Sequence, residues 1–292
     1  MFNLILLAND LSKASNCLID CADGFKKIGV RKIFITCALG IRHIDDLKYL
    51  LKEEAEPYLF DQKKKFEQKG FEVLVEIASG IPSEEINRVA DQKEVDLVVI
   101  GTHGESMAHH VVFKFDGMLS EVLHSFTRPL LLAHTKIVQK NVEKCASESC
   151  TDFTRKVLYC TDFSDTAQRA FDYVEKLVES GCKSVTIMHV QDKVKIDKHL
   201  LYKLDEFNKI DAERIEMLKE RLTRKGAQNI QSKLPYGIPT AEILNEVKKE
   251  DYSLIVMGSQ GRGYMREIFL GSVSHNITRN AEISVLLIPS IR

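Results

Sequence analysis

The sequence predicts an α/β protein of two tandem open-sheet domains, each a five-stranded parallel sheet with helices on both faces. Three observations predict this fold. Short apolar runs alternate with longer amphipathic segments, as in parallel sheets whose strands are connected by helices. The 292 residues suffice for two domains, because a typical domain takes roughly 100–200 residues. Finally, landmarks of the first half return in the same order in the second half.

Five apolar runs predict the strands of a first domain, placed at residues 1–134. The runs are Leu4–Ala8, Lys32–Ala38, Phe71–Ile77, Asp96–Gly101 and Leu130–Ala133. Ser12 follows the first run and is a suitable N-cap for a helix that Gly29 ends. A further helix is expected to begin at Gly117. Continuous apolar runs favour strands that are buried on both faces.

A polar linker at residues 135–154, with one short helix, separates this domain from a second one at residues 155–292. The second domain repeats the strand pattern near Lys156–Cys160, Ser184–Val190, Asn229–Leu234, Leu254–Met257 and Ser284–Ile288. A long helix around residues 197–225 is expected to turn five apolar side chains inward, those of Leu204, Phe207, Ile215, Leu218 and Leu222.

Three pairs of landmarks indicate an internal duplication. Asp10-Leu11-Ser12 returns as Asp162-Phe163-Ser164, at an offset of 152 residues. Two further segments return at an offset of 157 residues: Gly80-Ile81-Pro82 as Gly237-Ile238-Pro239, and Gly101-Thr102-His103-Gly104 as Gly258-Ser259-Gln260-Gly261. Nearly constant offsets in an unchanged order predict two copies of one structural unit.

Charge and hydropathy argue against several functional classes of protein. The 41 Lys and Arg residues nearly balance the 42 Asp and Glu residues, which argues against a nucleic-acid-binding protein. No apolar run approaches the roughly 18 residues that a membrane span needs. The apolar N-terminus lacks the basic start and the cleavage site of a signal peptide. We therefore expect a cytoplasmic protein without membrane or nucleic-acid partners.

The seven cysteines are an odd number in a chain long enough to fold without cross-links. This favours a reducing compartment over a disulfide framework. Cys145 and Cys150 lie in the linker and are interpreted as two unpaired thiols, with a redox pair or half of a metal site as the alternatives. The other cysteines are expected to fill small apolar spaces, at Cys17, Cys21, Cys37, Cys160 and Cys182.

A glycine-rich stretch of the second domain carries the clearest functional signal. The apolar run Leu254–Met257 stops at Gly258, and Gly261 and Gly271-Ser272 follow before the last predicted strand. Glycines allow backbone N–H groups to approach a bulky anion, and a helix N-terminus adds about half a positive charge. Open parallel sheets bind ligands beyond the carboxyl ends of their strands, where Asp162 is also expected. The stretch therefore predicts a site for a phosphate-bearing ligand.

This pattern resembles the nucleotide-binding branch of the universal stress protein family, over nearly the whole chain. That branch has Gly-x2-Gly-x9-Gly-Ser/Thr, which the second half matches at every fixed position, from Gly258 to Ser272. The family also places an Asp just past the first strand, matched by Asp162, and often ends its second strand in His-Val, matched by His189-Val190. The resemblance implies a Rossmann-like nucleotide site formed by Thr161, Asp162, Val190, Gly258, Gly261, Arg262, Gly271, Ser272, Val273 and Ser274.

The resemblance also implies roles within this site. Asp162 would contact the adenosine portion, and the Val190 backbone would meet the adenine edge. The loop glycines, Ser272 and Ser274 would line the ribose and the phosphates, where hydroxyl groups can donate to phosphate oxygens. Arg262 could neutralise phosphate charge or remain an exposed arginine. For Asp162 we favour ligand contact over helix capping, because Ser164 is better placed for the cap.

The first half departs from the motif. Twelve residues instead of nine separate Gly104 from Gly117, and Met118 and Glu121 stand where Ser272 and His275 stand in the second half. A methionine offers phosphate no donor, and an acid repels it. We therefore expect a degenerate first site. His103, His109 and His110 are interpreted as exposed loop histidines, with a metal site as the alternative.

The leading hypothesis for function is a stress-response or signalling protein that binds ATP, ADP or AMP, with or without Mg²⁺. A slow ATP-hydrolysing enzyme and a non-binding interaction scaffold are the alternatives. The chain lacks a Gly-x4-Gly-Lys-Ser/Thr loop, and no catalytic residues are assigned. Single units of the family dimerise through their fifth strands. Leu130–Ala133 and Val285–Ile288 are accordingly expected to form an intramolecular pseudo-dimer, with a homodimer as a further expectation.

Overall fold

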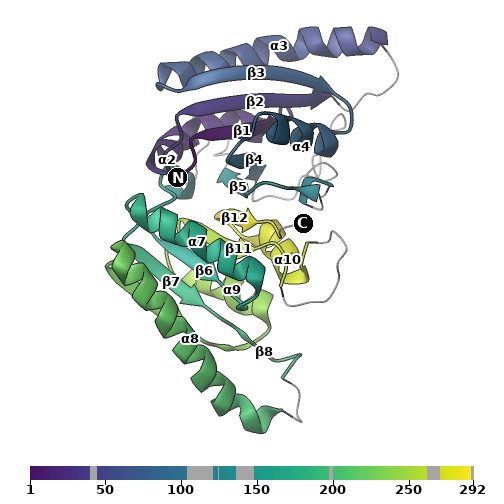
Figure 1. The fold of residues 1–292 in the computed structure, drawn as a ribbon. Helices are drawn as coiled ribbons and strands as arrows, with labels where there is room; N and C mark the ends of the chain where they lie inside the picture. The colour runs from purple at the N-terminus through teal and green to yellow at the C-terminus, as the bar shows by residue number, and fades with distance from the viewer. Residues whose placement is uncertain are drawn as a thin grey trace. The chain divides into compact units, whose positions relative to one another are not determined.

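A computed structural model describes residues 1–39, 45–103, 121–123, 125–135, 148–196, 200–261 and 270–290. The chain divides between Asp152 and Phe153 into two compact units, here called the first half and the second half. Both are α/β, with helices packed along parallel strands (Figure 1). The predicted fold class is therefore confirmed in each half.

The sheet of the first half has the strand order β3-β2-β1-β4-β5, and its strands run parallel to their neighbours. The strands are β1 (Leu4–Asn9), β2 (Lys32–Leu39), β3 (Glu72–Ser79), β4 (Leu97–His103) and β5 (Leu130–Thr135). All five overlap the predicted runs. The central strand β1 is flanked by β2 and β4, with Leu6 opposite both Phe34 and Val98. This arrangement brings the segment after β1 to the same edge as the segment after β4.

The helices of the first half follow the expected order with one interruption. Those with bounds inside the described residues are α1 (Lys13–Cys17), the 3-10 helix η1 (Leu18–Cys21), α2 (Ala22–Lys27), α3 (Asp45–Gln68), α4 (Pro82–Gln92) and α6 (Glu148–Thr151). Ser12 caps α1 as predicted, because its side chain accepts a hydrogen bond from the Ser15 backbone N–H. The single helix expected after Ser12 is instead broken into three pieces. The helix expected from Gly117 lies outside the described residues at its start.

The second half repeats this topology, with the strand order β9-β7-β6-β11-β12. Its strands are β6 (Val157–Cys160), β7 (Ser184–Met188), β9 (Asn229–Lys233), β11 (Leu254–Gly258) and β12 (Ser284–Ile288). Each takes the place of its counterpart in the order of the first half, as the duplication predicts. Two further short strands, β8 (Gln191–Asp192) and β10 (Tyr236–Gly237), pair with one another and were not predicted.

The helices of the second half are α7 (Asp165–Glu179), the 3-10 helix η2 (Leu201–Lys203), α8 (Leu204–Lys225), α9 (Pro239–Lys249) and α10 (Ser272–Asn280). Every residue of β11 is buried, and successive strand residues face opposite sides, so both faces of this strand are covered. On α8, Ile215, Leu218 and Leu222 are buried as expected, whereas Leu204 and Phe207 are only half-buried. Within the described chain, no helix is both long and apolar enough to span a membrane.

The packing of α7 fixes the position of the turn that precedes it. Phe171 is fully buried, and its ring lies 5.3 Å from that of Tyr159 on β6. The Tyr159 hydroxyl donates a 2.7 Å hydrogen bond to the Ala167 carbonyl, near the start of α7. Arg221 of α8 stacks on the Phe171 ring and forms a bidentate pair with Glu175. The first turn of α7 is thereby held against the carboxyl end of β6.

The cysteines of the first half correct one expectation from the sequence. Cys21 of η1 and Cys150 of α6 form a disulfide, and Cys17 is disulfide-bonded as well. The interpretation of Cys17 and Cys21 as apolar fillers and of Cys150 as an unpaired thiol is therefore wrong. Among the described residues, three further cysteines are buried outside the disulfides, as expected for small apolar fillers: Cys37, Cys160 and Cys182.

Candidate functional site

The candidate site lies where β6 and β11 end. These strands are adjacent and parallel, with Met257 opposite Cys160. Thr161 and Asp162 continue from β6, and the segment from Ser259 to Gly261 continues from β11, so both leave the same edge of the sheet. This is the edge at which open parallel sheets bind ligands.

The structure brings Asp162 and Gly261 together. A Cβ atom placed on Gly261 would lie 2.5 Å from Asp162 Oδ2, closer than any real Cβ contact. Gly258 is equally tight, because a Cβ there would lie 2.9 Å from Thr166 Cγ2 and 3.0 Å from the Thr166 carbonyl carbon. Gly261 thus lets the loop after β11 approach the turn after β6, and Gly258 lets the end of β11 approach the start of α7.

The turn after β6 is held by its own polar groups. Asp162 Oδ1 accepts hydrogen bonds from the Ser164 backbone N–H at 3.1 Å and from its hydroxyl at 2.6 Å. Between them, Phe163 has a left-handed φ of +59°, which a non-glycine residue rarely adopts. Ser164 also caps α7, since its side chain accepts from the Ala167 N–H at 3.3 Å. The cap therefore belongs to Ser164, as predicted, while Asp162 both holds the turn and faces Gly261.

Replacing Ser164 with alanine is expected to remove this cap. The loss should lower the free energy of unfolding of the second half by about 1 kcal/mol, the usual value of an N-cap side chain. A urea titration followed by circular dichroism measures the change. Ser232→Ala, on the exposed strand β9, is the matched control and should leave the midpoint unchanged. Equal midpoints for the two variants would contradict the capping role.

Thr161 joins β6 to β7. Its backbone N–H donates to the Met188 carbonyl at 2.9 Å, and its hydroxyl accepts from the Phe163 N–H at 3.0 Å. The His189 Nδ1 lies 2.7 Å from the Thr161 carbonyl. Thr161 is almost fully buried, so its part in the site is to shape the turn that presents Asp162.

The backbone of Val190 faces the end of β6. The N–H groups of His189 and Gln191 donate to the Lys233 and Pro235 carbonyls, on the side of β9. Alternate residues of a parallel strand direct their N–H and C=O groups to opposite neighbours. The backbone groups of Val190 therefore point to the other side, above the residues that follow β6. Val190 itself is 8% exposed.

Asp211 of α8 holds the side chains around Val190 in place through hydrogen bonds. Asp211 accepts a 2.8 Å hydrogen bond from Gln191 Nε2 and a 3.0 Å bond from Arg214 Nη1. His189 Nε2 lies 3.5 Å from the same carboxylate, and Arg214 stacks on the Phe163 ring at 5.3 Å. Sequence reasoning missed this cluster. The available signal was an acid on the buried stripe of the long helix, one turn before Ile215.

The far side of the site is the start of α10. Gly271 is its N-cap, and the Gly271 N–H donates to the Ser259 carbonyl at 2.8 Å, which closes the loop. Ser272 is exposed at the first position of α10, and Val273 beside it is half-buried. The first backbone N–H groups of a helix have no partner inside the helix, so this end can receive an anion. Arg262 lies outside the described residues.

Ser274 departs from its expected role. Its side chain is buried, and its hydroxyl donates a 2.9 Å hydrogen bond to the Gly258 carbonyl. The proton that was expected to face a phosphate is thus used to join α10 to the end of β11. A contact of Ser274 with a nucleotide stays a prediction. Ser274 instead fixes the helix start at its distance from the glycine loop.

The corresponding region of the first half is described only in part. Asp10 Oδ1 accepts from the Ser12 N–H at 3.0 Å and from the Ser15 hydroxyl at 2.5 Å, and Leu11 has a φ of +60°. The turn of the second half is thus repeated. Glu121 accepts a hydrogen bond from Ser83, whereas residues 104–120, which include Gly104, His109, His110, Gly117 and Met118, lie outside the described residues. The described chain contains no group of three or more potential metal-binding side chains.

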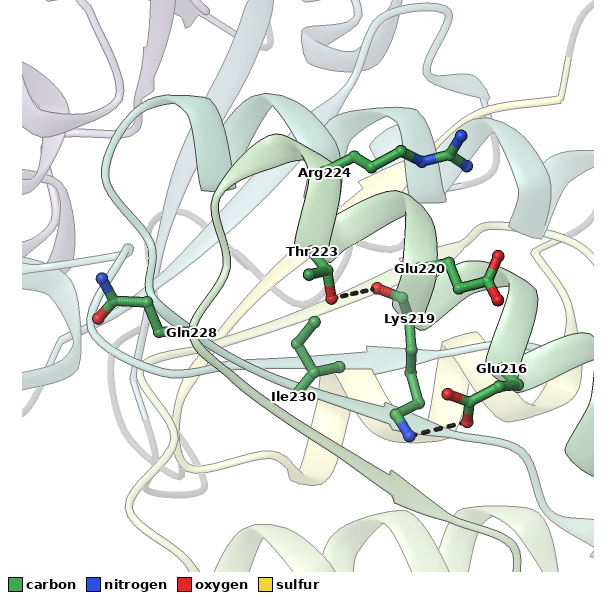
Figure 2. Close-up of a pocket in the computed structure, with 7 residues that line it drawn as sticks. All are labelled: Glu216, Lys219, Glu220, Thr223, Arg224, Gln228 and Ile230. Atoms are coloured by element: carbon green, nitrogen blue, oxygen red, sulfur yellow. Dashed lines mark hydrogen bonds and ion pairs between the residues drawn. The ribbon is translucent and has the colours of Figure 1, made fainter.

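A separate hollow of about 590 Å³ lies between α8 and β9. Figure 2 shows its polar lining, with an ion pair of 2.8 Å between Lys219 and Glu216. The residues that line it are Glu216, Lys219, Glu220, Thr223, Arg224, Gln228 and Ile230. They come from the end of α8 and the start of β9, so this hollow lies at the amino edge of the sheet. It is distinct from the candidate site, and no ligand is assigned to it.

Comparisons with known proteins agree with the duplicated fold. The model of the universal stress protein family matches residues 39–134 and 154–289. A universal stress protein of Methanocaldococcus jannaschii is 32% identical over an alignment of 152 residues, and the alignment covers 46% of this chain and 94% of the relative. Another universal stress protein, from Bacillus subtilis, is 29% identical over an alignment of 144 residues, which covers 46% of this chain and 97% of that relative. Both relatives have about the length of one half.

The crystal structure of a universal stress protein from Archaeoglobus fulgidus aligns with the whole chain. Its TM-score is 0.76, its sequence identity is 22%, and 99% of each chain is covered. At this identity the likeness supports the fold alone. The family model, by contrast, matches well over half of the sequence, in two separate regions. The chain therefore belongs to the universal stress protein family, as two successive copies of its characteristic unit.

Proposed function

We propose that the second half binds an adenine nucleotide and that the chain is an ATP-binding regulatory protein of the stress response. One observation carries the proposal: the glycine loop closes so tightly on the turn after β6 that Gly261 has no room for a side chain beside Asp162. Two segments about 100 residues apart in the sequence meet at this point. Such close approach is the ordinary use of glycine at a ligand loop.

The charges of the site favour a nucleoside phosphate of one orientation. The Asp162 carboxylate is an acceptor and would repel phosphate, so it suits the hydroxyl groups of a ribose. The start of α10, with the exposed hydroxyl of Ser272, offers donors and a positive dipole end. Phosphates would therefore lie toward α10 and the ribose toward Asp162. Gly258 and Gly261 form the floor between the two.

The base would lie beside Val190. Its backbone groups face the end of β6, and one donor and one acceptor on adjacent backbone positions suit the edge of an adenine. The surrounding side chains are braced by Asp211, which hydrogen-bonds to Gln191 and Arg214. Because this region is held by protein contacts, it offers a fixed surface to a flat ring.

For the first half we propose no phosphate binding. Asp10 repeats the turn of Asp162, whereas Glu121, at the position of His275, adds a negative charge where phosphates would lie. Two alternatives remain, slow ATP hydrolysis and an interaction scaffold. Turnover of ATP would distinguish the first from the proposal, and the absence of nucleotide binding would distinguish the second. The pseudo-dimer of the two halves, the homodimer and the cytoplasmic location stay predictions.

Analysis of the nucleotide that the protein carries is the direct test. The purified chain is denatured, and the released material is separated by ion-exchange chromatography, with ATP, ADP and AMP as standards. Calorimetric titration of the stripped protein with each nucleotide, with and without Mg²⁺, gives the affinities. We expect one nucleotide site per chain. No released nucleotide together with no measurable binding would reject the proposal, and rapid turnover of ATP would favour an enzyme.

A further inference from the structure

The linker between the two halves is attached covalently to the first half. Cys150 of α6 and Cys21 of η1 form a disulfide, with their Cα atoms 4.9 Å apart. The bond spans 129 residues of sequence, and both cysteines are fully buried. None of the contacts described above for the candidate site involves Cys21 or Cys150, so this bond requires an explanation of its own.

The ion pair at this attachment is weak compared with a covalent bond. Lys27 of α2 forms an ion pair with Asp152, but both side chains are partly exposed, and such pairs contribute only about 0–1 kcal/mol. The helix α6 spans only Glu148–Thr151, far below the roughly 12–15 residues that a helix needs for stability on its own. The helix packs against α2, η1 and β5, and the disulfide adds a covalent bond to these contacts.

The helix that contains Cys21 differs from its counterpart in the second half. In the second half α7 runs without interruption over 15 residues. Its counterpart in the first half is broken into α1, η1 and α2, and the 3-10 turn of η1 ends at Cys21. Cys17, at the end of α1, is also disulfide-bonded. The two copies of the unit thus differ where the first one carries its disulfide cysteines.

We propose that Cys21 and Cys150 form a thiol–disulfide exchange site that controls the tether between the two halves. Asp152 is the last residue of the first half and Phe153 the first of the second. With the bond closed, the chain leaves the first half at a fixed point, two residues after Cys150. With the bond open, α6 detaches, and the tether between the halves becomes longer. The range of positions open to the second half grows with tether length.

The exchange chemistry needs a small disulfide or a dithiol from solution. Closure consumes the two protein thiols and one small-molecule disulfide; one S–S bond breaks, one forms, and the two thiol protons end on the two released thiols. Opening is the reverse reaction with a dithiol, which becomes a cyclic disulfide and leaves Cys21 and Cys150 as thiols. Both sulfur atoms are buried, so α6 must lift before a thiolate can attack.

Peptide mapping establishes the bond. Trypsin releases residues 14–26, which contain Cys17 and Cys21, and residues 145–155, which contain Cys145 and Cys150. From protein purified without reductant and digested under acidic, non-reducing conditions, these two peptides should appear as one linked species. Fragmentation should place a bond between Cys21 and Cys150. Recovery of both peptides unlinked and alkylated would overturn the proposal.

Limited proteolysis of the full chain tests the control of the tether. A cut after Lys144 lies inside the loop that the disulfide closes, so the two fragments stay joined on a non-reducing gel and separate on a reducing gel. After treatment of the folded protein with a millimolar dithiol, we expect cleavage in the linker to be at least about tenfold faster, because α6 is released. An unchanged cleavage rate would contradict the proposal. So would a disulfide that the dithiol reduces only in denaturant, because such a bond would be a permanent structural cross-link.

Two variants make this test specific. Cys17→Ala/Cys21→Ala removes every disulfide partner in the broken helix, and its linker should be cut as fast as that of the reduced wild type. Cys37→Ala is the matched control in the same half. Burial, with a smaller effect of Asp10, raises the pKa of the Cys37 thiol to about 12, so this thiol stays protonated and unreactive. Equal cleavage of both variants would contradict the proposal, and circular dichroism verifies that each is folded.

Discussion

Gly261→Val will abolish nucleotide binding by the second half. The first added carbon would lie 2.5 Å from Asp162 Oδ2, so either the glycine loop or the carboxylate must move. Gly261 is exposed, so the steric clash of the added side chain disturbs the candidate site and leaves the hydrophobic core unchanged. We expect Kd for ATP to rise by at least about 100-fold, or about 2.8 kcal/mol, in a calorimetric titration.

The duplication supplies the control. Gly104 is the counterpart of Gly261 in the first half, and Gly104→Val should leave the affinity for ATP unchanged. The melting temperatures of both variants should remain close to that of the wild type. Loss of binding in Gly104→Val, with Gly261→Val unaffected, would reverse the assignment of the two halves. Loss in both would show that the halves bind together.

Cys17→Ala/Cys21→Ala will destabilise the first half far more than the second. Closing a loop of 129 residues lowers the entropy of the unfolded chain, which corresponds to about 5 kcal/mol in the chain-entropy model. Measured losses for native disulfides are about 2–5 kcal/mol. Alanine is used because it fits the space of a buried cysteine and introduces no polar group.

Hydrogen exchange followed by mass spectrometry resolves the two halves in one experiment. Amides of β1, β2 and β4 should exchange faster in the double variant, while those of β6, β7 and β11 should not change. Cys37→Ala, which removes a free buried thiol of β2, controls for the loss of a sulfur atom. Equal protection of the first half in the double variant and the wild type would contradict a stabilising disulfide.

The strands were predictable because burial on both faces leaves a strong signal. β12, for instance, occupies Ser284–Ile288, the residues expected from the apolar run alone. The small sheet of β8 and β10 was missed, since two-residue strands carry no periodicity. The break of the first helix into three pieces was missed for another reason. Its apolar spacing fits a continuous helix, and the disulfide that accompanies the break acts from a distant segment.

The candidate site was predictable as far as strand topology determines it. Asp162 and Gly261 meet because they follow neighbouring parallel strands, and both facts could be inferred from the repeat. The direction of individual hydrogen bonds could not be inferred from the sequence. Ser274 matches the expected pattern of small polar residues, yet its hydroxyl donates to the Gly258 carbonyl. Such choices depend on distances of a few tenths of an ångström, which residue types do not encode.

The disulfide shows where counting cysteines fails. An odd total excludes complete pairing, but it does not exclude a bond among some of the seven. Cys21 and Cys150 are adjacent only because α6 returns to the first half after β5. That contact depends on the tertiary structure and has no counterpart in local spacing.

The position of this bond in the chain also sets the order of events during synthesis. Ribosomes add roughly 5–20 residues per second, so about 6–26 s pass between the synthesis of Cys21 and that of Cys150. Small domains fold within about a second or less. The first four strands, which end at His103, are therefore made well before Cys150 and are able to begin pairing. Cys21 has no Cys150 to pair with while these strands are made, and the cross-link can form only once Cys150 has been added.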